Sequence, residues 1–214
     1  MKLRPIYLIY DSGITESERK IATETVREAA RIYGHRNCFI AGTRPILGTR
    51  RVSIDAIVDE AESGIDKGYG VQKDVYDLWE SIETCKMMRE APFICVFITS
   101  RDITVQDLNF CFGYTRGTIT VNSVARFRCL RKEDEALMIW GIIMHELGHV
   151  FGLATGGRAH TEENLGPHCT NYGCTMNQGL TLQKMYTVFR KAAEMRRCYC
   201  PECANQLMQN RFRF

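Results

Sequence analysis

The sequence WGIIMHELGHVFGL occupies residues 140–153 and carries the pattern H-E-x-x-H inside a strongly apolar run. In an α-helix, side chains four residues apart lie on one face, with Cβ atoms roughly 5–6 Å apart. We therefore expect His145 and His149 to direct one nitrogen each at a single ion, and neutral imidazole suits Zn2+. Burying such polar groups without partners would cost on the order of several kcal/mol, which favours a metal site over a chance pattern in a core helix.

Glu146 follows the first of these histidines and should lie beside the metal without binding it. From that position its carboxylate can take a proton from a metal-bound water, whose pKa the ion lowers towards about 7. Attack of the hydroxide on a carbonyl, with the proton passed to the leaving amine, is peptide-bond hydrolysis. The pattern therefore predicts a zinc peptidase in which Glu146 is general base and acid.

The composition of the 214-residue chain is that of one globular domain, with 45% hydrophobic and 25% charged residues. A net charge of +3 arises from 28 basic and 25 acidic residues without a basic run, so no nucleic-acid partner is expected. Residues 1–10 lack a signal-peptide cleavage site. The apolar run before His145 is shorter than the ~20 residues that cross a bilayer. We expect a cytoplasmic monomer without membrane attachment.

Strand-like and helix-like segments alternate along the chain, which predicts an α/β (α+β) fold with a mixed, twisted sheet. The continuous apolar run 92–99 is typical of a buried parallel strand. The strand over 117–122 alternates polar with apolar residues, which suggests one wet face and a place at the sheet edge, where an extended peptide could pair; an ordinary half-exposed strand is the alternative. Strands are expected over 3–10, 92–99, 110–114 and 117–122, and helices over 15–33, 71–89, 133–153 and 181–196.

A catalytic zinc site needs a third protein ligand and an open position. Gly152 lets the chain turn sharply and leave the helix. Three residues later, where the metzincin pattern has its third histidine, this chain has Thr155. The candidates that follow are His160 and His168, with Glu162 or Glu163 as a carboxylate alternative.

Five of the ten cysteines lie after residue 168, in a chain that is long for a disulfide scaffold. A C-x4-C pair and a C-x2-C pair match a closed structural zinc site with four thiolates, formed by Cys169, Cys174, Cys200 and Cys203. Such a site would hold the loop that carries His168. Cys198 is the alternative to Cys200, and a nucleophilic pair of Cys169 with His168 is a minor alternative.

This series of motifs resembles the archaemetzincin family of zinc metallopeptidases over about the last third of the chain. The matching residues are His145, Glu146, His149, Gly152, Leu153, His168, Cys169, Cys174, Met176, Cys200 and Cys203. The resemblance implies a metzincin-like zincin fold, a catalytic zinc on the three histidines, a structural zinc on the four cysteines, and a Met-turn at Met176 beneath the catalytic metal. Fifteen residues separate Gly152 from His168 where the family has two, which indicates an inserted surface loop over residues 154–167.

The motifs divide one catalytic domain into two parts. Residues 1–153 should form an α/β subdomain that ends in the active-site helix. Residues 154–214 should form a small C-terminal subdomain with the third ligand, the Met-turn and the four-cysteine zinc site. The expected function is hydrolysis of a peptide or protein substrate by a zinc-bound water that Glu146 activates. The alternative is a catalytically silent zinc protein of the same fold that binds peptides, and Glu146 favours the enzyme because a structural site does not need it.

Overall fold

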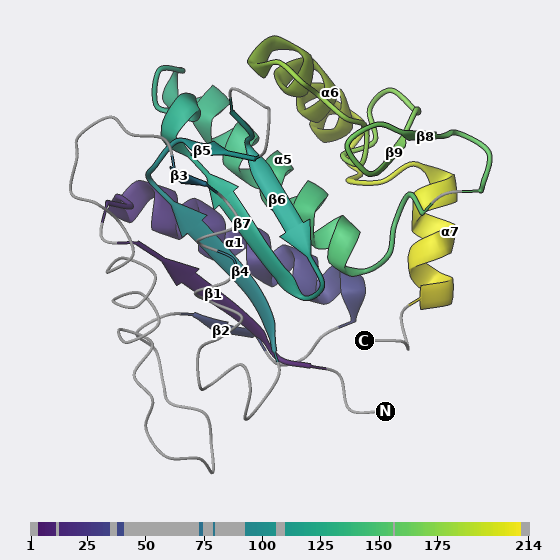
Figure 1. Cartoon of the computed structure of the whole chain (residues 1–214), viewed down its shortest axis with the longest axis horizontal. Coiled ribbons are helices and arrows are strands. Elements are labelled where there is room, and N and C mark those ends of the chain that lie inside the picture. Colours follow the sequence, from purple (N-terminus) through teal and green to yellow (C-terminus); the bar gives the residue numbers. More distant parts are fainter. Residues whose placement is uncertain are drawn as a thin grey trace.

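The computed structural model describes residues 4–11, 13–34, 38–40, 73–74, 79, 93–105, 110–155 and 157–210. A five-stranded sheet with the strand order β2-β1-β4-β7-β6 forms its centre. Helices α1 and α5 pack side by side on one face of this sheet, and the C-terminal helices lie on the far side of α5 (Figure 1). The predicted mixed α/β fold, with a backing helix and a second helix that carries H-E-x-x-H, is confirmed.

Four strands of the sheet are parallel and one terminal strand is antiparallel. The parallel strands are β1 (Ile6–Tyr10), β2 (Cys38–Ile40), β4 (Ile94–Thr99) and β7 (Ile119–Ser123). Strand β6 (Gly113–Arg116) runs antiparallel to β7. All six residues of β4 are buried, as its continuous apolar sequence predicted for a strand covered on both faces. Two small sheets pair β3 (Lys73–Asp74) with β5 (Ile103–Thr104) and β8 (Thr161–Glu163) with β9 (Pro167–Cys169).

Helix α1 (Glu16–Tyr33) begins one residue after the start of the expected range 15–33 and ends where that range ends. The Thr15 hydroxyl accepts from the backbone N–H of Glu18, and the Glu18 carboxylate accepts from the backbone N–H of Thr15, which is a capping box. Gly34 ends the helix with φ of 75°, a conformation that glycine adopts without strain. The other helices are the 3-10 turn η1 (Ala125–Phe127), α5 (Lys132–Val150), α6 (Leu182–Glu194) and α7 (Pro201–Asn210).

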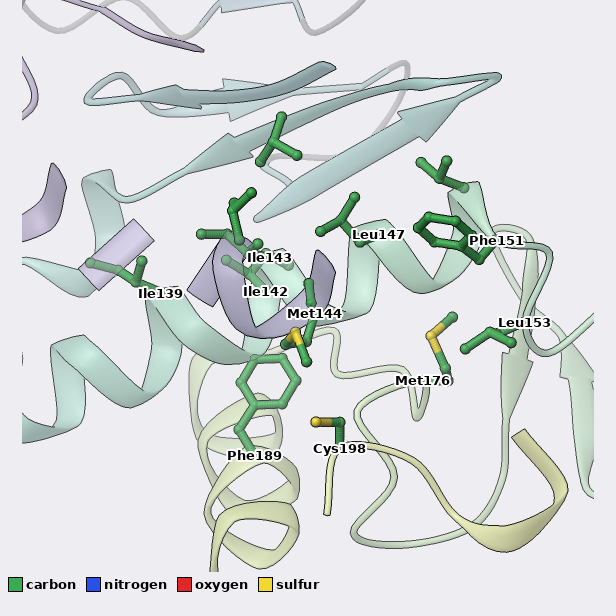
Figure 2. Close-up of a cluster of buried hydrophobic side chains, with 14 of the residues drawn as sticks. Ile139, Ile142, Ile143, Met144, Leu147, Phe151, Leu153, Met176, Phe189 and Cys198 are labelled. Atoms are coloured by element: carbon green, nitrogen blue, oxygen red, sulfur yellow. The ribbon is translucent and has the colours of Figure 1, made fainter. Parts of the chain in front are cut away.

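Helix α5 is buried because the sheet and α1 cover one side of it and α6 covers another. Its residues Ile139, Ile143 and Leu147 are fully buried in the core (Figure 2). Phe189 of α6 packs directly on the helix backbone at Gly141, where an added Cβ would overlap the phenyl ring. Close approach of α6 therefore depends on a glycine in the middle of α5.

The prediction for the strand over 117–122 is wrong on two points. The corresponding strand β7 lies between β4 and β6, so it is not at the sheet edge. All five of its residues are buried, so it has no wet face. The polar side chains are accommodated by local hydrogen bonds, in which Asn122 Nδ2 donates to the Phe97 carbonyl at 3.2 Å and to the Thr120 hydroxyl at 2.9 Å. The terminal strand on this side of the sheet is β6, whose first two residues belong to the aromatic segment expected over 110–114.

The helix expected over 71–89 lies outside the described residues except at three positions. Lys73 and Asp74 form strand β3, so the helix prediction is wrong there, whereas Trp79 is helical and buried. Helix α7 was not predicted, because its first turn coincides with the C-x2-C motif. Within the described ranges, no helix combines the length and the apolar character that crossing a bilayer requires.

Replacing Gly141 with alanine should destabilise the protein, although alanine is the better helix former by about 0.8–1.0 kcal/mol. The new methyl group would overlap the Phe189 ring, and overpacking a core typically costs about 1–3 kcal/mol. We expect a lower free energy of unfolding in urea titrations. Gln183→Ala, on the exposed face of α6, is the control and should stay within about 0.5 kcal/mol of wild type. A Gly141→Ala protein as stable as wild type would contradict this packing.

Candidate active site and metal centres

Three histidines from two distant segments meet beside α5. His145 and His149 lie one turn apart on α5, and His168 lies in β9. One ligand atom from each ring lies within 4.8 Å of the other two. The Nε2 atoms of His145 and His149 are 3.1 Å apart. Two nitrogens that bind one tetrahedral zinc at about 2.0–2.1 Å would be ~3.4 Å apart, so the three rings fit a single zinc ion.

Backbone carbonyls orient two of the three rings. Nδ1 of His145 lies 2.6 Å from the carbonyl oxygen of Thr175, and Nδ1 of His168 lies 2.8 Å from that of Gly166. In both pairs Nδ1–H is the donor, since a carbonyl can only accept. This tautomer leaves Nε2 of His145 and of His168 unprotonated, which is the form that a metal ligand needs.

Burial keeps the histidines uncharged at neutral pH. Burial lowers the pKa of His145 to about 3, with His168 acting in the same direction and the Thr175 carbonyl opposing it. Burial and the two neighbouring rings hold the pKa of His149 well below its usual range. Burial also lowers the pKa of His168. Three neutral imidazoles can each offer an unprotonated ring nitrogen, which is the kind of ligand that zinc binds.

Glu146 lies on α5 between the two helical histidines, and its side chain points towards β6. It is 4% exposed, and its Oε2 accepts a hydrogen bond of 2.6 Å from the Thr115 hydroxyl. An added Cβ at Gly113 would overlap the same carboxylate, so a glycine in β6 leaves the space that Glu146 occupies. Burial raises the pKa of Glu146 to about 7, and the Thr115 hydrogen bond opposes that rise. A carboxyl group with such a pKa can both accept and return a proton near neutral pH.

Met176 packs against the helix that carries the histidines. Its sulfur lies on the backbone of Gly148, where an added Cβ would overlap it, and Figure 2 shows its side chain beside Leu153. The same turn also ties the site together through its backbone. The Thr175 carbonyl accepts from His145, and the Met176 carbonyl accepts from the backbone N–H of Cys169 at 2.8 Å. The turn thus joins α5 to the strand that carries His168.

Four buried cysteines form a second cluster next to β9. Its members are Cys169, Cys174, Cys200 and Cys203. The sulfurs of Cys169 and Cys200 are 3.7 Å apart, and two thiolates on one tetrahedral zinc at about 2.3 Å would be ~3.8 Å apart. A hydrogen bond with Cys174 is the main cause that lowers the pKa of Cys169 to about 7. The four ligand sulfurs lie within 4.8 Å of one another, which is the spacing that a single tetrahedral zinc requires.

The structure brings some of the candidate ligands together and leaves others apart. His160 is exposed, with φ of 61°, and belongs to neither metal-type group of the described residues. Glu162 and Glu163 are exposed on β8 and also lie outside both groups. The Cys198 side chain lies in the apolar core beside Phe189 (Figure 2), outside the four-cysteine group. The geometry therefore favours His168 over the alternatives and Cys200 over Cys198, while the roles of these residues stay predictions.

Sequence reasoning did not identify three features of the site. The Thr115 hydroxyl binds the Glu146 carboxylate, and the lack of a side chain at Gly113 leaves room for that carboxylate. The Thr175 carbonyl binds the His145 ring. Thr115 and Gly113 belong to an unremarkable strand more than thirty residues before Glu146, and only strand pairing brings them there. The one sequence feature that could have pointed to Thr175 is its position next to Met176.

His168→Asn should lower the zinc content of the purified protein, because it removes one of the three nitrogens of the histidine group. His160→Asn is the matched control, since asparagine tolerates positive φ and His160 lies outside the group. Zinc per chain, measured by mass spectrometry after dialysis against a weak chelator, should fall only for His168→Asn. A fall for His160→Asn with none for His168→Asn would identify the other histidine as the ligand.

No family model matches the chain. The curated relatives include an archaemetzincin from Methanopyrus kandleri, 32% identical over 118 residues, which are 53% of this chain and 54% of that protein. An archaemetzincin from Thermococcus kodakarensis is 28% identical over 131 residues, which are 57% of this chain and 59% of that protein. The matching regions thus span little more than half the length of these relatives.

Solved structures resemble the fold over nearly its whole length. The crystal structure of archaemetzincin from Methanopyrus kandleri has a TM-score of 0.65 at 21% identity and matches 97% of this chain and 95% of its own. Archaemetzincin from Archaeoglobus fulgidus, complexed with malonate, has a TM-score of 0.58 at 20% identity, with 94% and 99% of the two chains matched. A zinc-dependent peptidase from Methanocorpusculum labreanum has a TM-score of 0.54 at 17% identity, also with 94% and 99% matched. The curated relatives and the solved structures together support the archaemetzincin family, to which the sequence motifs pointed.

Proposed function

We propose that this protein is a zinc-dependent peptidase that hydrolyses peptide bonds in peptides or proteins. The observation that carries the proposal is a buried carboxylate beside three neutral imidazoles that converge from α5 and β9. A purely structural metal site has no use for a buried carboxylate with a pKa of about 7 next to it. The similar proteins include an archaemetzincin and a zinc-dependent peptidase, which supports the same activity.

The histidine group would hold the catalytic zinc through His145, His149 and His168, and the four-cysteine group would hold a second, structural zinc. When bound to the histidines, zinc supplies positive charge that polarises a peptide carbonyl and makes water more acidic. Four thiolates complete a tetrahedral shell and leave no position for water, which suits a purely architectural ion.

Glu146 moves the proton in the proposed reaction. Its Oε2 is engaged by the Thr115 hydroxyl, so Oε1 is the atom that would accept the proton of the attacking water. The same oxygen would then return that proton to the nitrogen of the leaving amine. The Thr115 hydroxyl fixes the plane of the carboxylate during both transfers, and burial keeps bulk water from competing for the proton.

Strand β6 is suited to align the substrate. It is one of the two terminal strands of the five-stranded sheet, and its residues Gly113 and Thr115 touch Glu146. An extended peptide that pairs with the backbone of β6 would present its carbonyls beside the carboxylate without any requirement for particular side chains. This assignment replaces the strand over 117–122, which lies inside the sheet.

Glu146→Gln should abolish hydrolysis of a fluorogenic peptide library while leaving bound metal unchanged. Glutamine keeps the shape of the side chain but cannot accept the proton, and loss of a general base typically lowers the rate about 10²–10⁴-fold. Zinc per chain and the circular dichroism spectrum serve as controls. Wild-type turnover of the same library that survives in Glu146→Gln would refute this role. An inactive wild type that binds library peptides would favour the silent, peptide-binding protein.

Thr115→Val should lower kcat by about 10-fold or more, because a hydrogen bond to a charged group contributes about 1.5–3 kcal/mol. KM and zinc content should change little, since valine keeps the shape of threonine and the histidine group is untouched. Thr115→Ser restores the hydroxyl and should recover most of the lost rate. Equal impairment of the serine and valine variants would show that the residue acts by packing and not by holding Glu146.

A further inference from the structure

The chain that leaves α5 is fastened to one face of α7. Asn210 donates from Nδ2 to the backbone carbonyl of Gly152 at 3.1 Å. One turn earlier on α7, Gln206 accepts from the backbone N–H of Ala154 at 2.9 Å. Positions separated by three or four residues share a helix face, so these contacts form one row along α7. The start of the inserted segment therefore follows α7 towards the four-cysteine cluster, where that helix begins.

The row ends with a guanidinium group on a cysteine. Arg158, from the inserted segment, donates from Nη2 to the sulfur of Cys203 at 2.8 Å. The arginine is half-buried, and its Nε and Nη1 atoms are shielded from solvent without a hydrogen-bond partner among the described residues. Burying such a group is unfavourable unless negative charge lies beside it. The position of Arg158 therefore points to charge on the cysteine cluster.

Each sulfur of the cluster accepts at least one N–H donor. The donors are the backbone N–H of Asn171 for Cys169 at 3.4 Å, the backbone N–H of Cys200 for Cys174 at 3.4 Å, the Asn171 side-chain amide for Cys200 at 3.3 Å, and Arg158 for Cys203. Three of these four donors are neutral amides, and the fourth carries a full positive charge. Hydrogen bonds of this kind stabilise thiolates and orient them around a metal.

Charge balance gives Arg158 a specific task. Four thiolates together with one Zn2+ leave two negative charges in a buried cluster, and an uncompensated buried charge is strongly destabilising. The guanidinium removes part of that excess at the shortest of the four N–H···S contacts. Arg158 belongs to residues 154–167, so the compensating positive charge comes from the inserted segment. A plain surface loop would not place a charged group against the cysteine cluster.

We propose that Arg158 is the charge-compensating residue of the four-cysteine zinc site, and that this contact also anchors the inserted segment. The proposal rests on the function proposed above insofar as the four cysteines bind zinc. It does not depend on catalysis at the histidine group. Loss of the positive charge should weaken metal binding by the cysteines by about 10- to 100-fold, the usual effect of removing an outer partner of a metal ligand.

Cobalt(II) provides the test, because its thiolate charge-transfer absorption reports the four-cysteine site separately from the histidines. The full chain is loaded with cobalt, mixed with excess EDTA, and followed by the decay of that absorption. Arg158→Gln should lose cobalt about 10- to 100-fold faster than wild type. Arg197→Gln is the matched control, since Arg197 is exposed and its guanidinium donates to the sulfur of Met195, away from the four cysteine sulfurs. Its decay should equal that of wild type.

Equal decay rates for wild type and Arg158→Gln would overturn the proposal. If Arg158→Gln does not fold, Arg158→Lys decides: it keeps the positive charge, so its cobalt release should stay within a few-fold of wild type, whereas release about 10- to 100-fold faster than wild type would overturn charge compensation. A wild-type protein without thiolate absorption would overturn both this proposal and the structural zinc. Peptide hydrolysis measured on the same samples judges the peptidase separately.

Discussion

The hydrogen bond from Nδ1 of His145 to the carbonyl oxygen of Thr175 joins the buried helix α5 to the C-terminal part of the chain. It fixes the imidazole tautomer, so that Nε2 faces His149 and His168, and it places Met176 against the helix at Gly148. The neighbouring carbonyl of Met176 holds Cys169, which follows His168. One short turn therefore sets the position of the third histidine and the start of the four-cysteine cluster.

A second constraint comes from the other side of α5. The sheet presents its antiparallel terminal strand β6 to the helix, and Thr115 and Gly113 form the surface on which the Glu146 carboxylate lies. A strand and a turn thus hold two adjacent residues of one helix from opposite sides. In the proposed hydrolysis such fixed placement would help, because groups held in position do not have to be ordered during the reaction.

The inserted segment changes the usual spacing between the second and third histidines without moving the third away from the site. Its beginning is attached to α7, its middle to Cys203 through Arg158, and its end forms the β8–β9 hairpin that carries His168. Extra residues in a loop cost little free energy, whereas a loose ligand would cost metal affinity. Because the inserted segment is anchored along α7, His168 has a defined position although the connection from α5 is long.

The sequence by itself determined the features that depend on local spacing. The periodicity and caps of α1, the buried strand β4, the pair His145 and His149 on one helix face, and the two cysteine pairs all follow from residues close together in the chain. Their resemblance to the archaemetzincins extended this to the grouping of the three histidines. Spacing could not choose between His160 and His168 on its own, because both follow the same glycine-rich connection.

Only the tertiary structure decided what depends on long-range pairing. Strand order placed β7 inside the sheet and β6 at its end, against the alternating pattern of residues 117–122. The partners of Glu146 and His145, namely Thr115 and Thr175, lie 31 and 30 residues away on either side. The contact of Arg158 with Cys203 spans 45 residues. No local pattern encodes such contacts, because they arise from the packing of whole elements whose register the sequence does not state.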